Sequence, residues 1–291
     1  DYFNYTVSDG TDTDIARLTI TVLGTNDDVT AVNDYGVVTE DATLTVTNGE
    51  SQNLSGSYNT HDEHSGDISA NDTDLDASST HTITAIRIGS SEGSGTAGTV
   101  GSALTGTYGQ LTLNSNGSYT YVANQDATDA LDVGDTVSDY FNYTVSDGTD
   151  TDTAVIRIYV KGANDTPVAA NDTGSVNEDA TLTVSDGSGD IIANNDTDAD
   201  DSASLVVSAI RLGGTEGSGT AGTVGSALTG TYGTLTLNAN GSYTYVADQA
   251  AADALDAGDT VTDVFNYTLS DGTTTDLSLI HISEPTRPMN I

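Results

Sequence analysis

The sequence contains neither cysteine nor tryptophan, and only three of its 291 residues are proline. Because there is no cysteine, disulfide bonds do not hold this fold together. Lysine and arginine total 6, against 44 aspartate and glutamate residues, and the formal net charge is −38. Phosphate binding requires clustered basic residues, so the composition excludes nucleic acid and anionic membrane surfaces as partners. No apolar run reaches the length of a bilayer span, and we expect no membrane insertion.

A long repeat is the clearest pattern that the sequence does contain. The segment DYFNYTVSDGTDTD occupies Asp1–Asp14, returns unchanged at Asp139–Asp152, and recurs as DVFNYTLSDGTTTD at Asp263–Asp276. The two spacings are 138 and 124 residues, and the difference comes from about fourteen extra residues between Gly49 and Ser65 in the first copy. A period of this length is the size of a domain and exceeds that of a solenoid repeat, so it predicts tandem modules with separate cores.

The repeat predicts the domain boundaries. Residues 1–27 correspond to the C-terminal strands of a truncated preceding module, 28–165 to a complete β-sandwich repeat, and 166–276 to a second repeat that lacks its last strand. Residues 277–291 depart from both copies, since they hold two of the three prolines and the only methionine. A reverse translation of Leu277–Arg287 resembles a transposase adapter used to prepare sequencing libraries. We interpret 277–291 as adapter read-through and not native sequence; a divergent natural C-terminus is the alternative.

The secondary structure is predicted to be all-β. Seven segments alternate apolar and polar residues and are rich in Thr, Val, Ile and Tyr. They span residues 17–22, 42–46, 81–88, 110–113, 118–122, 141–145 and 154–160. Asn116-Gly117 predicts a hairpin turn with positive φ. Seven short strands in about 130 residues are typical of an immunoglobulin-like sandwich, interrupted at Asp126–Asp135 and Gln249–Asp259 by a turn or two of helix.

Aromatic residues lie on one face of two predicted strands. Phe141 and Tyr143 share a face, and so do Tyr119 and Tyr121, because side chains alternate along a strand. Packing in the hydrophobic core is the favoured interpretation, and a platform for stacking sugars is the alternative.

Three segments carry a family resemblance: Gly230–Gly272, Ala169–Val184 and Asn194–Asp200. Together they resemble the VCBS repeats, and their cadherin-like relatives, of large secreted bacterial proteins of the RTX type. The resemblance implies an extracellular or cell-surface location, type I secretion, and a role in adhesion or biofilm formation. The predicted fold class is therefore all-β, with tandem immunoglobulin- or cadherin-like β-sandwich modules.

Acidic clusters recur from copy to copy, and most of their members are aspartate. They comprise Asn26, Asp27, Asp34, Glu40, Asp41, Asp72, Asp74, Asp76, Asp147, Asp150 and Asp152, and then Asn164, Asp165, Asp172, Glu178, Asp179, Asp196, Asp198 and Asp200. Calcium takes six to eight oxygen ligands, so several loops must converge on each ion. The resemblance implies such convergence, because cadherin-like modules combine a linker Asn/Asp, an early-strand Glu and a D-x-D loop. We predict Ca²⁺ at the module junctions, with solvated acidic turns as the alternative.

Other metal motifs fit poorly. Asp72–Asp76 does not begin an EF-hand loop, because Ala77 replaces the turn glycine and Ile83 replaces the bidentate Glu. His61-Asp-Glu-His64 lies inside the insertion that the second copy lacks, which favours a solvated loop over a metal cluster.

No pattern of residues predicts an enzyme, and two functions remain. The modules are either structural extenders of a large bacterial adhesin, stiffened by calcium, or binding modules for a glycan or matrix. The near-identity of the copies favours the extender. The expected partners are neighbouring repeats of the same chain, with surface glycans or matrix bound through missing tip domains.

Overall fold

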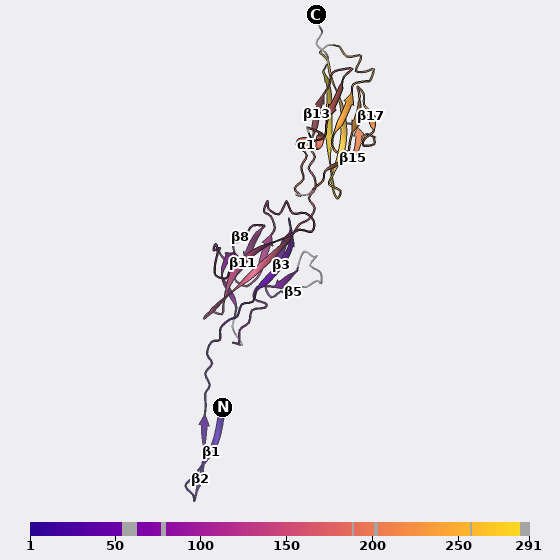
Figure 1. Cartoon of the computed structure of the whole chain (residues 1–291). Helices are drawn as coiled ribbons and strands as arrows, with labels where there is room; N and C mark the ends of the chain where they lie inside the picture. The colour runs from indigo at the N-terminus through magenta and orange to yellow at the C-terminus, as the bar shows by residue number, and fades with distance from the viewer. Residues whose placement is uncertain (54–62, 77–79, 188, 201–202, 257, 286–291) are drawn as a thin grey trace.

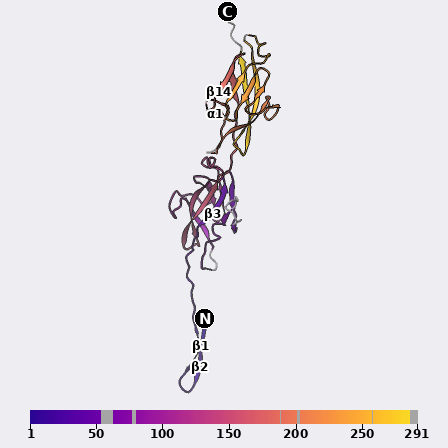
Figure 2. The same ribbon diagram turned by 45° about the vertical axis from the view of Figure 1, so that its right-hand side comes forward.

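A computed structural model describes residues 1–53, 63–76, 80–187, 189–200, 203–256 and 258–285. Over these residues the fold is all-β, with 46% strand, and the predicted fold class is confirmed. Figures 1 and 2 show two β-sandwiches arranged end to end and a separate hairpin at the N-terminal side. The arrangement of the described residues is that of modules on a string.

The hairpin consists of β1 (Tyr2–Ser8) and β2 (Thr13–Thr19), and all of its residues are exposed. Phe3 is 51% exposed, whereas Phe141, its counterpart in the first repeat, is fully buried. Strand β2 stops at Thr19, short of the predicted end at residue 22. In the first repeat, a further strand pairs with the equivalent end of the hairpin. The same sequence therefore forms the same hairpin here without the core that covers it there.

The first repeat is a sandwich of two sheets with the orders β5-β6-β3-β12-β11-β7 and β4-β10-β9-β8. Its strands are β3 (Asp34–Thr39), β4 (Thr43–Val46), β5 (Ser51–Asn53), β6 (His64–Gly66), β7 (Thr82–Ile88), β8 (Ala103–Thr105), β9 (Gln110–Leu113), β10 (Tyr119–Val122), β11 (Thr136–Ser146) and β12 (Thr151–Lys161). The first strand, β3, pairs in parallel with the last, β12. This pairing places the exit of the repeat beside the end of β3.

The second repeat has sheets of order β13-β21-β20-β15-β16 and β14-β19-β18-β17. Its elements are β13 (Asp172–Ser175), β14 (Thr181–Val184), α1 (Ile191–Asn195), β15 (Val206–Leu212), β16 (Thr220–Ala221), β17 (Ala227–Thr229), β18 (Thr234–Leu237), β19 (Tyr243–Val246), β20 (Thr260–Ser270) and β21 (Thr275–Pro285). The segments predicted to form short helices, 126–135 and 249–259, contain hydrogen-bonded turns.

The second repeat has a last strand in this structure, contrary to the prediction that it lacks one. Strand β21 pairs with β20 at every position from Thr275 to Pro285. The strand forms because Ile280 and Ile282 alternate with polar residues and are fully buried. Ser278 and Glu284 nevertheless occupy the inward positions that Ala154 and Val160 hold in the first repeat. Adapter origin for 277–291 stays a prediction; residues 286–291 lie outside the described residues.

Aromatic residues form the centre of each sandwich. Tyr119, Tyr121, Phe141 and Tyr143 are at most 1% exposed, so the core interpretation is confirmed. The rings of Tyr121 and Phe141 meet edge to face at 6.4 Å between centroids. The four residues therefore cannot stack against a sugar.

Local sequence explains which strands were missed. Strand β3 contains Gly36, which weakens the strand signal, but a Cβ there would lie 2.5 Å from Leu44 Cδ2. Strand β6 lies at the end of the insertion, and Glu63 and His64 are buried there, so for these two residues the solvated-loop prediction is wrong. His61 lies outside the described residues. The predicted turn at Asn116-Gly117 is present, with Gly117 at φ 87°.

Candidate metal centre

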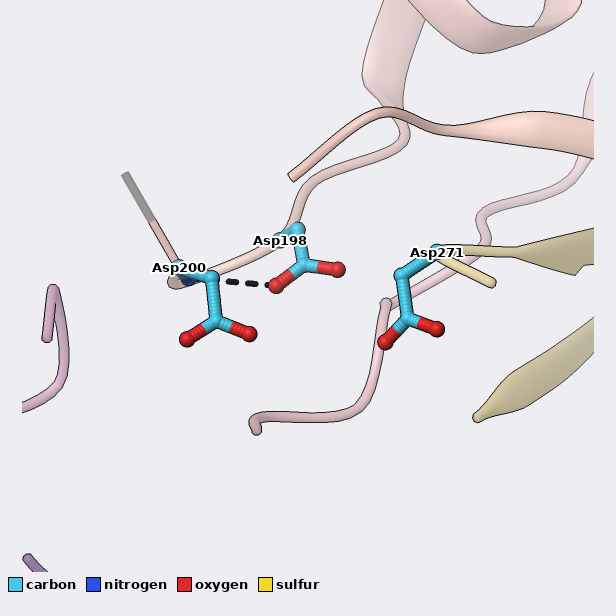
Figure 3. Close-up of side chains that lie close together, drawn as sticks. All are labelled: Asp198, Asp200 and Asp271. Atoms are coloured by element: carbon cyan, nitrogen blue, oxygen red, sulfur yellow. Dashed lines mark hydrogen bonds between the residues drawn. The ribbon is translucent and has the colours of Figure 1, made fainter. Parts of the chain in front are cut away.

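An acidic centre lies where the two repeats meet. Asp198 and Asp200 come from the loop before β15, and Asp271 comes from the turn between β20 and β21. One carboxylate oxygen from each lies within 4.8 Å of the other two. Figure 3 shows the three side chains side by side, with the backbone N–H of Asp200 donating to Asp198 Oδ1 at 3.1 Å. Three half-buried carboxylates are thus held together by two separate loops.

The linker between the repeats is bound to this centre. Asn164 Nδ2 donates to Asp271 Oδ2 at 2.8 Å, and the backbone N–H of Asp165 donates to Asp200 Oδ2 at 3.0 Å. Burial alone raises the pKa of Asp271. Hydrogen bonds from Asn164 and from the backbone of Thr273 and Thr274 outweigh this effect and bring the pKa of Asp271 below its usual range. Asp271 is therefore held as an anion.

The first repeat contributes Glu40, which follows the end of β3. Glu40 is 5% exposed, and its Oε1 accepts a hydrogen bond from the backbone N–H of Ala163 in the linker. Burial, followed by repulsion from Asp165, Asp200 and Asp41, raises the pKa of Glu40 to about 7. Asp41 adopts φ 58°, a left-handed conformation that aspartate tolerates better than most residues. Its equivalent Asp179 does the same at φ 61°.

Several carboxylate oxygens at the junction are buried without a hydrogen-bond partner. Within the described residues these are Glu40 Oε2, Asp165 Oδ2, Asp198 Oδ2 and Asp200 Oδ1. Burial, followed by repulsion from neighbouring carboxylates, raises the pKa of both Asp165 and Asp200. Unpaired buried carboxylates are costly, and an all-oxygen set from three segments is what a calcium ion requires. The residues present therefore fit Ca²⁺.

The N-terminal end of the first repeat repeats this arrangement. Asn26 Nδ2 donates to one oxygen each of Asp147 and Asp150 at 3.0 Å, and the backbone N–H of Asp27 donates to Asp76 Oδ2 at 2.9 Å. Asp74 Oδ2 is buried without a partner among the described residues, like its counterpart Asp198. The hydrogen-bond pattern of the linker therefore recurs one repeat apart, although within the described residues only Asp198, Asp200 and Asp271 bring three carboxylate oxygens within 4.8 Å of one another.

Most other predicted ligands form hydrogen bonds within their own repeat. Asp34 is buried and accepts hydrogen bonds from Tyr143, Ser65 and Asn71, so its oxygens are occupied. The remaining ones are Asp72, Asp152, Asp172 and Asp196, which accept from backbone N–H groups or from Tyr267, and Glu178 and Asp179, which lie at the far end of the second repeat. Within the described residues, Asp72 Oδ2 is nevertheless buried without a hydrogen-bond partner.

Sequence reasoning missed three acidic residues at the junction. Asp271 is central, and its equivalence to Asp147 in the repeated SDGT segment was the signal that could have found it. Asp129 and Asp132, from the turns before β11, add to the repulsion that raises the pKa of Asp165 and Asp200 respectively. No spacing pattern connects these turns to the loops of the next repeat.

Among the described residues, no helix is long and apolar enough to cross a membrane.

A family model described as bacterial cadherin-like domain matches residues 26–162 and 164–283. No curated protein matches the chain. Similar solved structures include mouse protocadherin-24 EC1-3, at 12% identity and a TM-score of 0.44, covering 98% of this chain and 80% of that one. Human protocadherin-24 EC1-2 is 14% identical, with a TM-score of 0.41, covering 87% and 95%. Endo-fucoidan hydrolase MfFcnA4, from glycoside hydrolase family 107, is 15% identical, with a TM-score of 0.24. The match covers 99% of this chain but only 34% of that protein.

Proposed function

Because the chain belongs to the bacterial cadherin-like domain family, we propose that its repeats are extender modules of a large extracellular bacterial adhesin, stiffened by Ca²⁺ at the module junctions. Domains of this family are adhesion-type repeat modules, usually extracellular and typically non-enzymatic. Attachment to the cell surface, type I secretion, a role in biofilm formation and membership of the VCBS group are parts of the proposal. The near-identical copies support an extender, since a spacer requires only repetition of one stable module.

One observation carries the proposal: unpaired carboxylate oxygens from the first repeat, the linker and the second repeat gather at one junction. Glu40 represents the first repeat, Asp165 the linker, and Asp198 and Asp200 the second repeat. Without a cation, carboxylates at this spacing repel and favour separation of the repeats. A shared divalent cation reverses that preference, because its attraction to each segment holds all three in one arrangement.

In the proposed site, Glu40, Asp165, Asp198, Asp200 and Asp271 would hold Ca²⁺ at the junction between the repeats. The equivalent set at the other end of the first repeat is Asn26, Asp27, Asp74, Asp76, Asp147 and Asp150. The ion supplies positive charge and oxygen coordination, while the hydrogen bonds of Asn164 and Asp165 fix the path of the linker. The site therefore couples the position of the linker to the presence of the cation.

The energies involved are modest but sufficient. Extracellular calcium modules bind with Kd of roughly 10⁻⁴ to 10⁻³ M. With free calcium about tenfold above Kd, each site adds about 1.4 kcal/mol to the stability of the folded chain. Two such sites supply a substantial part of the roughly 5–15 kcal/mol by which a domain is stable.

A calcium titration of the whole chain tests the proposal. Calorimetry should detect binding in the 0.1–1 mM range, as is usual for extracellular modules, and the midpoint of thermal unfolding should rise with calcium and fall when EGTA is added. Magnesium at equal concentration controls for ionic strength and should do much less, because it demands a rigid octahedral set. Unchanged unfolding in calcium and in EGTA would remove the basis of the proposal.

A further inference from the structure

A hollow of about 700 Å³ lies on the outer face of the six-stranded sheet of the first repeat. Strands β3 and β12 form its floor, and the turn at residues 133–135 forms one wall. Its lining includes Tyr159, Lys161, Asp135 and Thr136. The hollow adjoins the acidic centre through Ala163 and Asn164 of the linker, but its lining has one carboxylate, Asp135, together with an aromatic ring and a cation.

The ring of Tyr159 is held in place from one side. The guanidinium carbon of Arg157 lies 4.1 Å from the centroid of Tyr159 and 5.2 Å from that of Tyr140. Arg157 Nε also donates to Ser138 Oγ at 3.1 Å. Alternate residues of β12 point into the core, so Arg157, Tyr159 and Lys161 share the outer face. A positioned aromatic ring on an outer sheet face presents a flat surface at little entropic cost.

The positive charge of this face has no carboxylate partner. Lys161 is the only lysine in the sequence, and within the described residues neither Lys161 nor Arg157 forms a salt bridge. Arg87 and Arg211 instead donate to backbone carbonyls in glycine-rich loops. In a chain with 44 acidic residues, two adjacent cations without a salt bridge, beside an aromatic ring, indicate a ligand that brings its own negative charge.

We propose that this hollow binds a saccharide that carries a carboxylate, as a uronic acid does. The apolar face of the sugar ring would lie against Tyr159, as sugars do on aromatic side chains. Its carboxylate would pair with the Lys161 ammonium, and its hydroxyl groups would meet Asp135 and Thr136. Binding at this site would add recognition of an acidic glycan to an extender module.

The other copies lack the groups that the proposal needs. The repeat and its strand pairing align the following residues: Tyr159 with Ser283 and Thr21, Lys161 with Pro285 and Leu23, Arg157 with His281 and Thr19, and Tyr140 with Val264 and Tyr2. Only the first repeat combines the second ring with the lysine. The proposed site therefore belongs to the first repeat alone. The other copies show which residues the same strand tolerates at these positions.

The experiment titrates the whole chain, in saturating calcium, with tetrasaccharides of hyaluronan, galacturonate and alginate and with neutral cellotetraose. Isothermal calorimetry gives the Kd, and ¹⁵N-resolved NMR reports which backbone amides shift. We expect at least one acidic tetrasaccharide to bind with Kd of about 10⁻⁴ to 10⁻³ M, as for a small polar ligand with few contacts. The shifted amides should lie in residues 133–136 and 157–163.

Two variants replace the aromatic ring and the cation by threonine, which is common on the outer face of these strands. Y159T and K161T should each weaken binding about three- to tenfold, from the loss of the ring contact and of the charge pair. The control R17T removes the same charge at a distance and should leave Kd unchanged. Unchanged thermal unfolding of each variant shows that the sandwich is intact. Equal binding of cellotetraose, binding unaffected by Y159T and K161T, or no binding by any acidic tetrasaccharide at 10 times the expected Kd would each overturn the proposal.

Discussion

Replacing Glu40 by Gln should weaken calcium binding and, in the absence of calcium, should stabilise the chain. The substitution keeps the size of the side chain and its acceptor for the backbone N–H of Ala163. It removes the negative charge that the first repeat contributes to the junction. The two effects have opposite signs because one carboxylate is both a ligand for the cation and a source of repulsion without it.

The magnitude with calcium follows from Coulomb's law. A unit charge at about 2.4 Å from a divalent cation gains about 3 kcal/mol at the dielectric of water. Hydration of the free carboxylate offsets part of this gain. We expect E40Q to lose about 1–3 kcal/mol of binding free energy, which is roughly a 5- to 150-fold increase in Kd.

The magnitude without calcium follows from the pKa of Glu40, which is raised from an ordinary 4.5 to about 7. A carboxyl whose pKa is raised on folding binds its proton more tightly in the folded state. Stability is therefore greatest below the unfolded pKa and is lost as pH rises through about 7. At pH 8 the ionised Glu40 costs up to about 3 kcal/mol, and E40Q avoids that cost.

Glu178→Gln is the matched control. Glu178 occupies the position of Glu40 in the second repeat, where the described residues place no linker from a following module. Calorimetric titration gives the Kd of each variant, and thermal unfolding at pH 8 in EGTA gives the metal-free stability. If E40Q bound calcium like the unmodified chain, or shifted Kd no more than E178Q does, the first repeat would contribute no ligand and the reasoning would be refuted.

Two further predictions concern buried carboxyls. Burial raises the pKa of Asp34 to about 7. The free energy of unfolding of the metal-free chain should therefore fall by about 2–4 kcal/mol between pH 4 and pH 8. D34N should flatten this part of the profile of thermal unfolding against pH, and an unchanged slope would contradict the prediction. Glu284 occupies the inward position that Val160 holds in the first repeat, and its Oε2 has no partner among the described residues. E284V should stabilise the second repeat by about 1–3 kcal/mol in chemical denaturation. A destabilised variant would contradict the claim that the buried carboxylate of Glu284 weakens the packing of β21.

Local pattern was enough to predict the all-β fold, the repeat and most of the strands. Alternation of side chains identified β9, β10 and the long hairpin β11–β12, because those strands bury every second residue. It did not identify β3, where Gly36 is required by the close approach of Leu44. That requirement is set by the facing sheet and leaves no periodic signal in β3 itself.

The candidate site was only partly predictable for a related reason. The residue types and their recurrence marked Asp198 and Asp200 in advance. Sequence order placed Glu40 early in its repeat, but the parallel pairing of β3 with β12 brings it to the exit, beside Asp165 of the linker. Asp34 follows an asparagine in the sequence, as Asp27 and Asp165 do. It is nevertheless buried inside the sandwich, where it accepts a hydrogen bond from the hydroxyl of Tyr143. The topology of the sheets decides which acidic residues lie together, and the spacing of residues in the sequence does not predict it.

Stiffening of the junction by calcium is tested most directly by the distance between the two repeats. The chain has no cysteine, so T120C and T244C, at equivalent positions of β10 and β19, allow a spin label on each repeat. Pulsed electron paramagnetic resonance then gives the distribution of distances between the labels. We predict a single narrow distribution in calcium and a broad one in EGTA, with E40Q broad at calcium concentrations where the unmodified junction is narrow. Distributions of equal width in calcium and in EGTA would contradict the account.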